Sequence, residues 1–117
     1  MKENIIKTKS MEFALRIVKL YQYLSSTKKE FVLSKQLLRS GTAIGALVRE
    51  SEHAESKADF IHKLSIALKE ANESDYWIEL LFKSNYLTEP EYKTLFTDLD
   101  EIIRLLVSII KTSKGNK

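Results

Sequence analysis

Residues 60–81 read FIHKLSIALKEANESDYWIELL, and this stretch determines the fold class. Apolar or small side chains recur there in alternating steps of four and three residues, at Phe60, Leu64, Ala67, Ala71, Ser74, Ile78 and Leu81. This spacing places one continuous stripe along a helix and is typical of helices that pack in bundles. Just upstream, Ser56 and Asp59 have the spacing of a helix N-cap, with the acid near the positive end of the helix dipole. We therefore predict a helix over residues 56–85.

Three further segments have the same periodicity and recognisable ends. Ser10 is available as the N-cap of the first segment, and Ser34 as the N-cap of the second. In the third segment, Thr88 and Glu91 have the spacing of a capping box, and Pro90 suits the first turn. The predicted helices cover residues 10–27, 34–53 and 88–112.

The chain has 117 residues with one proline and three glycines, which favours long helices joined by short loops. Such helices pack as antiparallel neighbours, so we predict an all-α, antiparallel up-down four-helix bundle. We expect a single domain over residues 1–117, with frayed ends. The last helix has a second apolar stripe beside its first, at Tyr92, Phe96, Ile103, Val107 and Ile110. Because one core does not need so much apolar surface, we predict a homo-oligomer.

Cysteine is absent, which excludes disulfide bonds and thiolate zinc sites and suits a reducing compartment. Residues 1–8 lack the apolar stretch of a secretory signal. No segment approaches the roughly 20 apolar residues that span a bilayer. We therefore expect a cytoplasmic protein that does not associate with a membrane.

Charge is divided unevenly along the chain, although the net charge is only +3. Residues 1–49 hold ten Lys or Arg against three Glu, a net +7, and residues 50–117 hold nine against thirteen acids, a net −4. Six cations can form one edge that contacts the phosphates of RNA or DNA, namely Arg16, Lys19, Lys28, Lys29, Lys35 and Arg39. Tyr21 and Tyr23 can add base stacking, although helical spacing favours the core for Tyr21. Two alternatives stay open, a head-to-tail oligomer in which basic and acidic surfaces meet and a solvated exterior.

Two glycines four residues apart interrupt the second predicted helix. Each costs about 1 kcal/mol relative to alanine inside a helix, so an offsetting contact is expected. Gly41 and Gly45 lie on one helix face, where they allow two backbones to approach closely. A phosphate-binding loop is the alternative, but no strand precedes these residues and no Gly-Lys-Ser/Thr sequence follows them. We therefore predict that both glycines serve helix packing.

Two pairs of residues have the carboxylate-to-imidazole spacing used by di-metal bundles, Glu50 with His53 and Asp59 with His62. Asp59 already has a sufficient function as a helix cap, and the other helices offer no clear inward-facing glutamate at that level. We expect polar surface residues and no metal, with a metal site as the alternative.

Glu70 and Glu73 lie three residues apart in the middle of the third predicted helix. Paired carboxylates can serve acid-base chemistry, but nothing around them supplies a nucleophile, an oxyanion hole or a cofactor loop. A solvated or interface face is favoured for this pair. From the sequence we therefore predict that the protein is not an enzyme and that it has no catalytic residues and no cofactor.

An ordered series of segments carries a family resemblance: FALRIVKLY at residues 13–21, LSKQLLRSGTAIGA at 33–46, SKADF at 56–60 and IALKEA at 66–71. The chain resembles the bacterial four-helix-bundle proteins encoded by intervening sequences of 23S ribosomal RNA genes. The residues that match the family pattern are Gln36, Arg39, Ser40, Gly45, Glu50, Asp59, Phe60 and Glu70. Leu47 departs from it, since a polar residue is expected there, which puts any shared buried polar contact in doubt.

The resemblance implies a four-helix bundle and extends in fold to the accessory protein of diversity-generating retroelements. That protein forms a pentameric ring with a positively charged surface and associates with reverse transcriptase and nucleic acid. The resemblance thus implies a pentamer, with a protein partner such as a reverse transcriptase. Together with the basic edge, it favours a non-enzymatic oligomeric scaffold that binds RNA or DNA. The alternative is a protein-protein assembly module without nucleic-acid binding.

Overall fold

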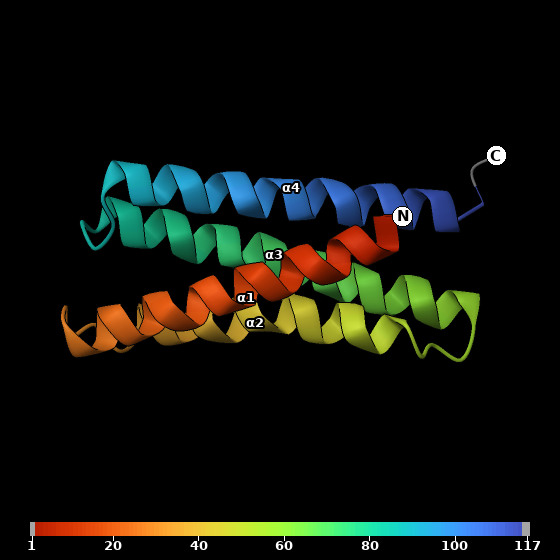
Figure 1. Cartoon of the computed structure of the whole chain (residues 1–117), viewed down its shortest axis with the longest axis horizontal. Coiled ribbons are helices and arrows are strands. Elements are labelled where there is room, and N and C mark those ends of the chain that lie inside the picture. Colours follow the sequence, from red (N-terminus) through yellow and green to blue (C-terminus); the bar gives the residue numbers. More distant parts are fainter. Residues whose placement is uncertain (1, 116–117) are drawn as a thin grey trace.

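Four helices make up most of the computed structural model, which describes residues 2–115. They are α1 (Lys2–Ser26), α2 (Leu33–Ser51), α3 (Lys57–Lys83) and α4 (Glu89–Ser113). The helices run alternately in opposite directions along a molecule that measures 47 × 22 × 19 Å (Figure 1). Each helix contacts the next one along the chain, and α4 returns to contact α1. The predicted all-α, antiparallel up-down four-helix bundle is therefore confirmed.

The predicted stripe on α3 lies at the centre of the core. Its small members Ala67, Ala71 and Ser74 are fully buried, and small side chains allow neighbouring helices to approach closely. Large, fully buried side chains from the other helices surround the stripe, namely Phe13, Ile17, Leu24, Leu37, Ile44, Leu99, Ile102 and Leu106. Burial of each such side chain contributes roughly 1.5–3 kcal/mol. The core therefore draws on all four helices.

The first helix begins at Lys2, well before the predicted start at Ser10. That prediction was wrong because Ser10 is not a cap. It lies buried inside the helix, and its hydroxyl donates to the Lys7 carbonyl oxygen at 3.2 Å. The apolar stripe continues beyond it to Ile6, which is also buried. Burial of Ile6 gives the extra turns a tertiary contact, so residues 2–9 are helical rather than frayed.

The caps of α3 and α4 follow the prediction. The Ser56 hydroxyl accepts from the Asp59 amide, and Thr88 and Glu91 form the capping box in full. At the end of α3, Asn85 takes a positive φ of 72°, and the Tyr86 amide donates to the Leu81 carbonyl at 2.9 Å. This is the pattern of a Schellman motif, which gives the chain a sharp turn into α4.

The ends of the chain differ in part from the expectation of fraying. α4 continues to Ser113, and Gly115 turns the backbone with a φ of +84°. Met1 and residues 116–117 lie outside the described residues. No helix within residues 2–115 is long and apolar enough to cross a membrane.

Glu30, rather than Ser34, caps the start of α2. Its buried carboxylate accepts hydrogen bonds from the amides of Val32 (3.1 Å), Leu33 (2.9 Å) and Ser34 (2.7 Å). The predicted cap was wrong, because the Ser34 hydroxyl instead donates backwards to the Glu30 carbonyl oxygen. Burial acts to raise the pKa of Glu30, but the amide hydrogen bonds outweigh it, so the pKa lies below its ordinary value of 4.5.

Replacement of Glu30 by alanine should destabilise the protein by about 1–3 kcal/mol at neutral pH, because three helix-end amides lose a charged acceptor. Since the pKa of Glu30 is lowered, its contribution is fully present above its ordinary value of 4.5 and is lost as pH falls through the lowered pKa. The difference between wild type and E30A should therefore shrink as pH falls below 4.5. Urea denaturation followed by circular dichroism measures it.

E30Q is the matched control, because glutamine keeps an acceptor oxygen but does not titrate. E30Q should lower the free energy of unfolding less than E30A does. The free energy of unfolding of E30Q should also lack the pH dependence that Glu30 gives to wild type. A difference between wild type and E30A that stays constant across the acid range would contradict the assignment of Glu30 as an ionised cap.

The two glycines of α2 lie against α1. A Cβ at Gly41 would lie 3.0 Å from Cγ1 and 3.2 Å from Cγ2 of Ile17. A Cβ at Gly45 would lie 3.4 Å from the backbone oxygen of Ser10, which is ordinary contact. Ile17 is buried and β-branched, so it has little freedom to move aside. Close packing therefore requires glycine more strictly at position 41 than at position 45.

Alanine substitution at the two positions should have different outcomes. G41A should destabilise the protein by about 1–2 kcal/mol, because steric overlap with Ile17 exceeds the gain in helix propensity. G45A should be neutral or stabilising by up to about 1 kcal/mol, since it gains the same propensity without the overlap. Thermal unfolding of the two variants beside wild type tests this contrast. Equal effects would show that the approach to Ile17 does not limit residue 41.

Candidate functional site

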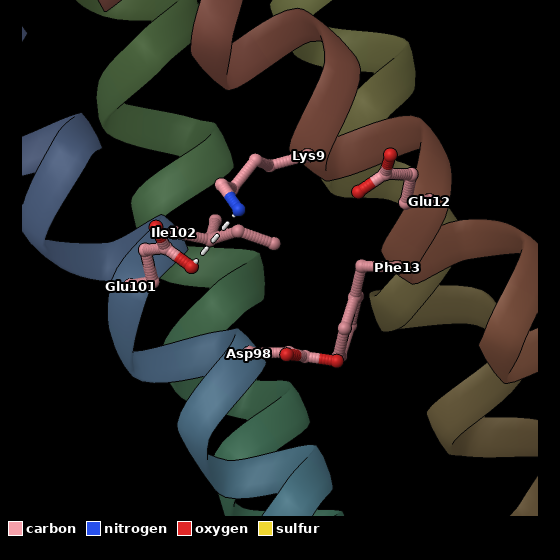
Figure 2. Close-up of a pocket in the computed structure, with 6 residues that line it drawn as sticks. All are labelled: Lys9, Glu12, Phe13, Asp98, Glu101 and Ile102. Carbon is pink, nitrogen blue, oxygen red and sulfur yellow. Dashed lines mark ion pairs between the residues drawn. The ribbon is translucent and has the colours of Figure 1, made fainter.

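Cations in the first part of α1 are paired with an acid at the end of α2 and with an acid of α4. Lys7 pairs with Glu52 at 3.3 Å and Lys9 with Glu101 at 3.2 Å. Figure 2 shows the second pair bridging α1 and α4, and both of its residues line a small cavity of about 60 Å³. This volume corresponds to about two water molecules. The groove between α1 and α4 is bridged by ion pairs.

Arg16 belongs to the same set of paired cations. Its guanidinium donates to Asp98 at 2.8 Å and to the Thr94 hydroxyl, both on α4. The sequence placed Arg16 in the predicted nucleic-acid-binding edge, and its two partners, Thr94 and Asp98, lie 78 and 82 residues away. The structure separates Arg16 from the other predicted cations, because its charge is already compensated.

Four lysines remain without such partners, and we call them the lysine cluster: Lys19, Lys28, Lys29 and Lys35. All four are exposed, and none forms a salt bridge with any residue in the range 2–115. Lys28 and Lys29 lie in the loop between α1 and α2, Lys35 lies in the first turn of α2 and Lys19 in the last third of α1. The loop is at the left of Figure 1. The loop between these helices has one acid, Glu30, whose carboxylate is turned into the amides of α2. The cluster is therefore uncompensated at the surface.

Exposed apolar side chains accompany the lysine cluster. Phe31 and Val32, which follow Glu30 in the loop, are 55% and 70% exposed. Tyr23 is exposed near the end of α1, whereas Tyr21 is half-buried. Sequence reasoning missed Phe31 and Val32, because two adjacent apolar residues in a short loop give no periodic signal. This end of the molecule therefore combines uncompensated lysines with exposed apolar side chains.

The α2–α3 pocket brings together polar residues that the sequence analysis treated separately. It has a volume of about 180 Å³, and its lining residues are Gln36, Arg39, Ser40, Ala43, Glu70 and Glu73. Arg39, predicted as part of the basic edge, thus lies beside two carboxylates of α3. Glu70 and Glu73, for which a solvated or interface face was favoured, line a hollow shared with α2.

Electrostatics in the α2–α3 pocket are unbalanced. Burial raises the pKa of Glu70 above its ordinary value of 4.5, and the charge of Glu73 and a hydrogen bond to it raise the pKa further. Lys69 and Arg39 act in the opposite direction but do not compensate. The ionised form of Glu70 is therefore held in an unfavourable environment.

A buried pair of hydroxyls lies behind the pocket. The Ser74 hydroxyl lies 2.9 Å from the Ser40 hydroxyl and 2.9 Å from the Glu70 carbonyl oxygen. Ser40 is 3% exposed and Ser74 is fully buried, so this contact joins α2 to α3 inside the core. The contact fixes the position of the backbone that carries the two carboxylates.

Both acids considered for metal binding have other partners. Glu50 pairs with Lys63 at 3.3 Å, and Asp59 accepts from the Glu55 amide at the start of α3. His53 and His62 are exposed. Within the part of the chain that the structure describes, no three histidines or acids come together in a way that could hold a metal ion.

Comparison with known proteins places this architecture in a family. Residues 2–108 match the family described as 23S rRNA-intervening sequence protein. The chain belongs to this family. A crystal structure of a protein with unknown function from the S23 ribosomal protein family of Bacteroides thetaiotaomicron VPI-5482 is similar, with 59% identity and a TM-score of 0.94. The match covers 95% of this chain and 99% of that one. No functionally curated protein matches the chain.

Membership of the 23S rRNA-intervening sequence protein family confirms the predicted resemblance. Four of the residues taken as matching the family pattern, Gln36, Arg39, Ser40 and Glu70, line the α2–α3 pocket. Leu47, the departure from that pattern, is half-buried and packs against the core. One buried polar contact between α2 and α3 is the hydroxyl pair of Ser40 and Ser74.

E70Q should raise the stability of the protein at neutral pH. Because the pKa of Glu70 is raised, stability linked to it is fully present below the ordinary value of 4.5 and is lost as pH rises through the raised pKa. A neutral glutamine should avoid that loss, so E70Q and wild type should converge in acid and diverge towards pH 7. Denaturant unfolding at several pH values tests this.

E55Q provides the control, because the Glu55 carboxylate is exposed at the start of α3 and outside the pocket. It removes one carboxylate elsewhere on the surface, so any change that E55Q shares with E70Q reflects the loss of a charge alone. A profile for E70Q that runs parallel to that of wild type would contradict the unbalanced charge of the pocket.

Proposed function

We propose that this protein is a non-enzymatic, self-associating scaffold that binds RNA or DNA through the lysine cluster at the α1–α2 end of the bundle. The observation that supports it is the contrast between two sets of cations. Lys7, Lys9 and Arg16 are paired with acids, whereas the cluster is exposed and has no salt-bridge partner within residues 2–115. Uncompensated cations at one end of a molecule attract polyanions such as nucleic acids.

Phosphate contacts by the cluster predict a characteristic dependence on salt. About four neutralised phosphates give a slope of about −3 to −4 in a plot of log affinity against log salt concentration. A fourfold increase in salt should then weaken binding about 50- to 150-fold. Phe31 and Tyr23 add exposed aromatic rings beside these cations, on which bases of a single strand can stack.

Self-association is supported by apolar stripes on two helices. Met11, Leu15 and Val18 are exposed and follow one face of α1, while Phe96 and Val107 are exposed on α4. The α4 residues belong to the second stripe predicted to exceed the needs of one core. Exposed apolar residues in a row favour contact with another protein surface. We propose a homo-oligomer, for which the family resemblance favours a pentamer and a partner such as a reverse transcriptase.

Neutralisation of the lysine cluster should weaken nucleic-acid binding without loss of the fold. The test variant is K28Q/K29G/K35Q, and glycine is chosen for Lys29 because its backbone has a positive φ of 59°. Binding to single-stranded RNA and duplex DNA, measured by fluorescence anisotropy at about 50 mM salt, should fall at least about 10-fold. The slope of log affinity against log salt concentration should become less steep by about 2 to 3.

The matched control removes three cations from the opposite end, as R49Q/K57Q/K114Q. It should bind almost as wild type does, because electrostatic attraction is screened over about 10 Å. Circular dichroism and light scattering should show that both variants keep their helicity and oligomeric size. Equal losses in the two triple variants would show that total charge, rather than the cluster, governs binding.

A second candidate is a protein-protein assembly module without nucleic-acid binding, which the apolar stripes on α1 and α4 favour. The substitution L15E should then abolish self-association by placing a charge in the α1 stripe. An oligomer that L15E dissociates, together with no nucleic-acid binding at low salt, would favour this second candidate over the first.

A further inference from the structure

The α2–α3 pocket lies outside the lysine cluster and has no part in the proposed nucleic-acid binding. Its lining is mostly polar, with hydrogen-bonding groups from both helices and one small apolar side chain, Ala43. Charge within it is uneven, since two carboxylates of α3 face a single guanidinium of α2. A pocket with these properties is complementary to a ligand that supplies positive charge and hydrogen-bond donors.

We propose that the α2–α3 pocket binds a small organic cation, an ammonium or guanidinium group, that donates hydrogen bonds to Glu70 and Glu73. Charge-assisted hydrogen bonds of this kind are about twice as strong as neutral ones, and a guanidinium can meet a carboxylate in a bidentate manner. The Gln36 amide and the Ser40 hydroxyl lie in the same lining and offer further acceptors.

Glu70 and Glu73 are hydrogen-bonded to each other, and their remaining acceptor positions are free for such a ligand. Arg39 acts on Glu70 through its charge. Among the salt bridges formed within residues 2–115, however, none joins Arg39 to Glu70 or Glu73. The side chain of Gln36 likewise has no hydrogen-bond partner there, since the bonds of α2 side chains involve only serine and threonine hydroxyls. The raised pKa of Glu70 agrees with a missing counter-charge, because a bound cation would favour its ionised form.

Size and charge distinguish an organic cation from a metal ion. A volume of about 180 Å³ corresponds to roughly six water molecules, which suits a cationic group on a short chain. Divalent metals take several oxygen ligands in a compact shell, whereas this pocket offers two carboxylates beside the positive charge of Arg39. No group of three metal-ligating side chains occurs among residues 2–115. The α2–α3 pocket therefore fits a diffuse organic cation better than a metal ion.

Agmatine is a suitable probe, because it carries both an ammonium and a guanidinium. Titration at low salt and neutral pH, followed by calorimetry and by the carboxyl carbon resonance of Glu70, should show saturable binding. E73Q and E70Q should each weaken it at least about 10-fold, the loss expected when one charge-assisted hydrogen bond is removed. E55Q should bind agmatine as wild type does, and 1,4-butanediol, which is uncharged, should not bind.

Two further arms make the test decisive. A43L fills the pocket without any change of charge and should also abolish binding, while thermal unfolding verifies that each variant is folded. N-acetyl-arginine amide presents the guanidinium as a polypeptide would. If it binds more tightly than agmatine, the natural cation is a protein side chain; the reverse order indicates a free amine.

Three results would overturn the proposal. One is the absence of binding by both cationic probes at millimolar concentration, and another is binding that E73Q and A43L leave unchanged. The third is displacement of agmatine by magnesium at equal concentration, which would assign the carboxylates to a metal. The variant K28Q/K29G/K35Q should bind agmatine normally, so failure of this proposal and failure of the proposed nucleic-acid function are separable.

Discussion

The close approach of α2 to both α1 and α3 is the constraint on which the rest of the structure depends. Adjacent residues of α2 serve the two contacts: Gly41 admits the side chain of Ile17 from α1, and the Ser40 hydroxyl meets Ser74 of α3. Two residues one step apart on a helix point in directions about 100° apart, so both contacts are made at one level. This level fixes how far each neighbouring helix is shifted along α2. The register in turn decides which polar residues meet at the surface of the bundle.

Much of the fold could be predicted from the sequence, because caps and stripes depend on residues close together in the chain. The stripe on α3, the N-cap at Ser56 and the capping box of Thr88 and Glu91 are examples. The start of α1 was misplaced, since a serine inside a helix resembles a cap unless its burial is known. The cap of α2 was missed because Glu30 lies four residues before the serine that seemed to fit.

The candidate site could be predicted only in part, since it depends on contacts between helices. Local spacing identified the cations but not their partners, and Asp98 neutralises Arg16 from 82 residues away. The α2–α3 pocket needs the register of two antiparallel helices, which no single segment contains. Arg39 and Glu70 were each noticed, but neither has a local signal that joins it to the other. The sequence therefore does not show that these two residues line the same pocket; the packing of α2 against α3 does.

The turn at Lys28 and Lys29 has a further consequence that follows from how firmly it is held. The Glu30 amide donates to the Leu24 carbonyl at 2.9 Å, and the Glu30 carboxylate gathers three amides of α2. Both ends of a loop only a few residues long are thus anchored, one in each helix. A charged segment that is already ordered loses little conformational entropy when it meets a partner, so more of the contact energy appears as affinity. The lysines at this end are displayed on a preorganised surface, rather than on a tail that must fold as it binds.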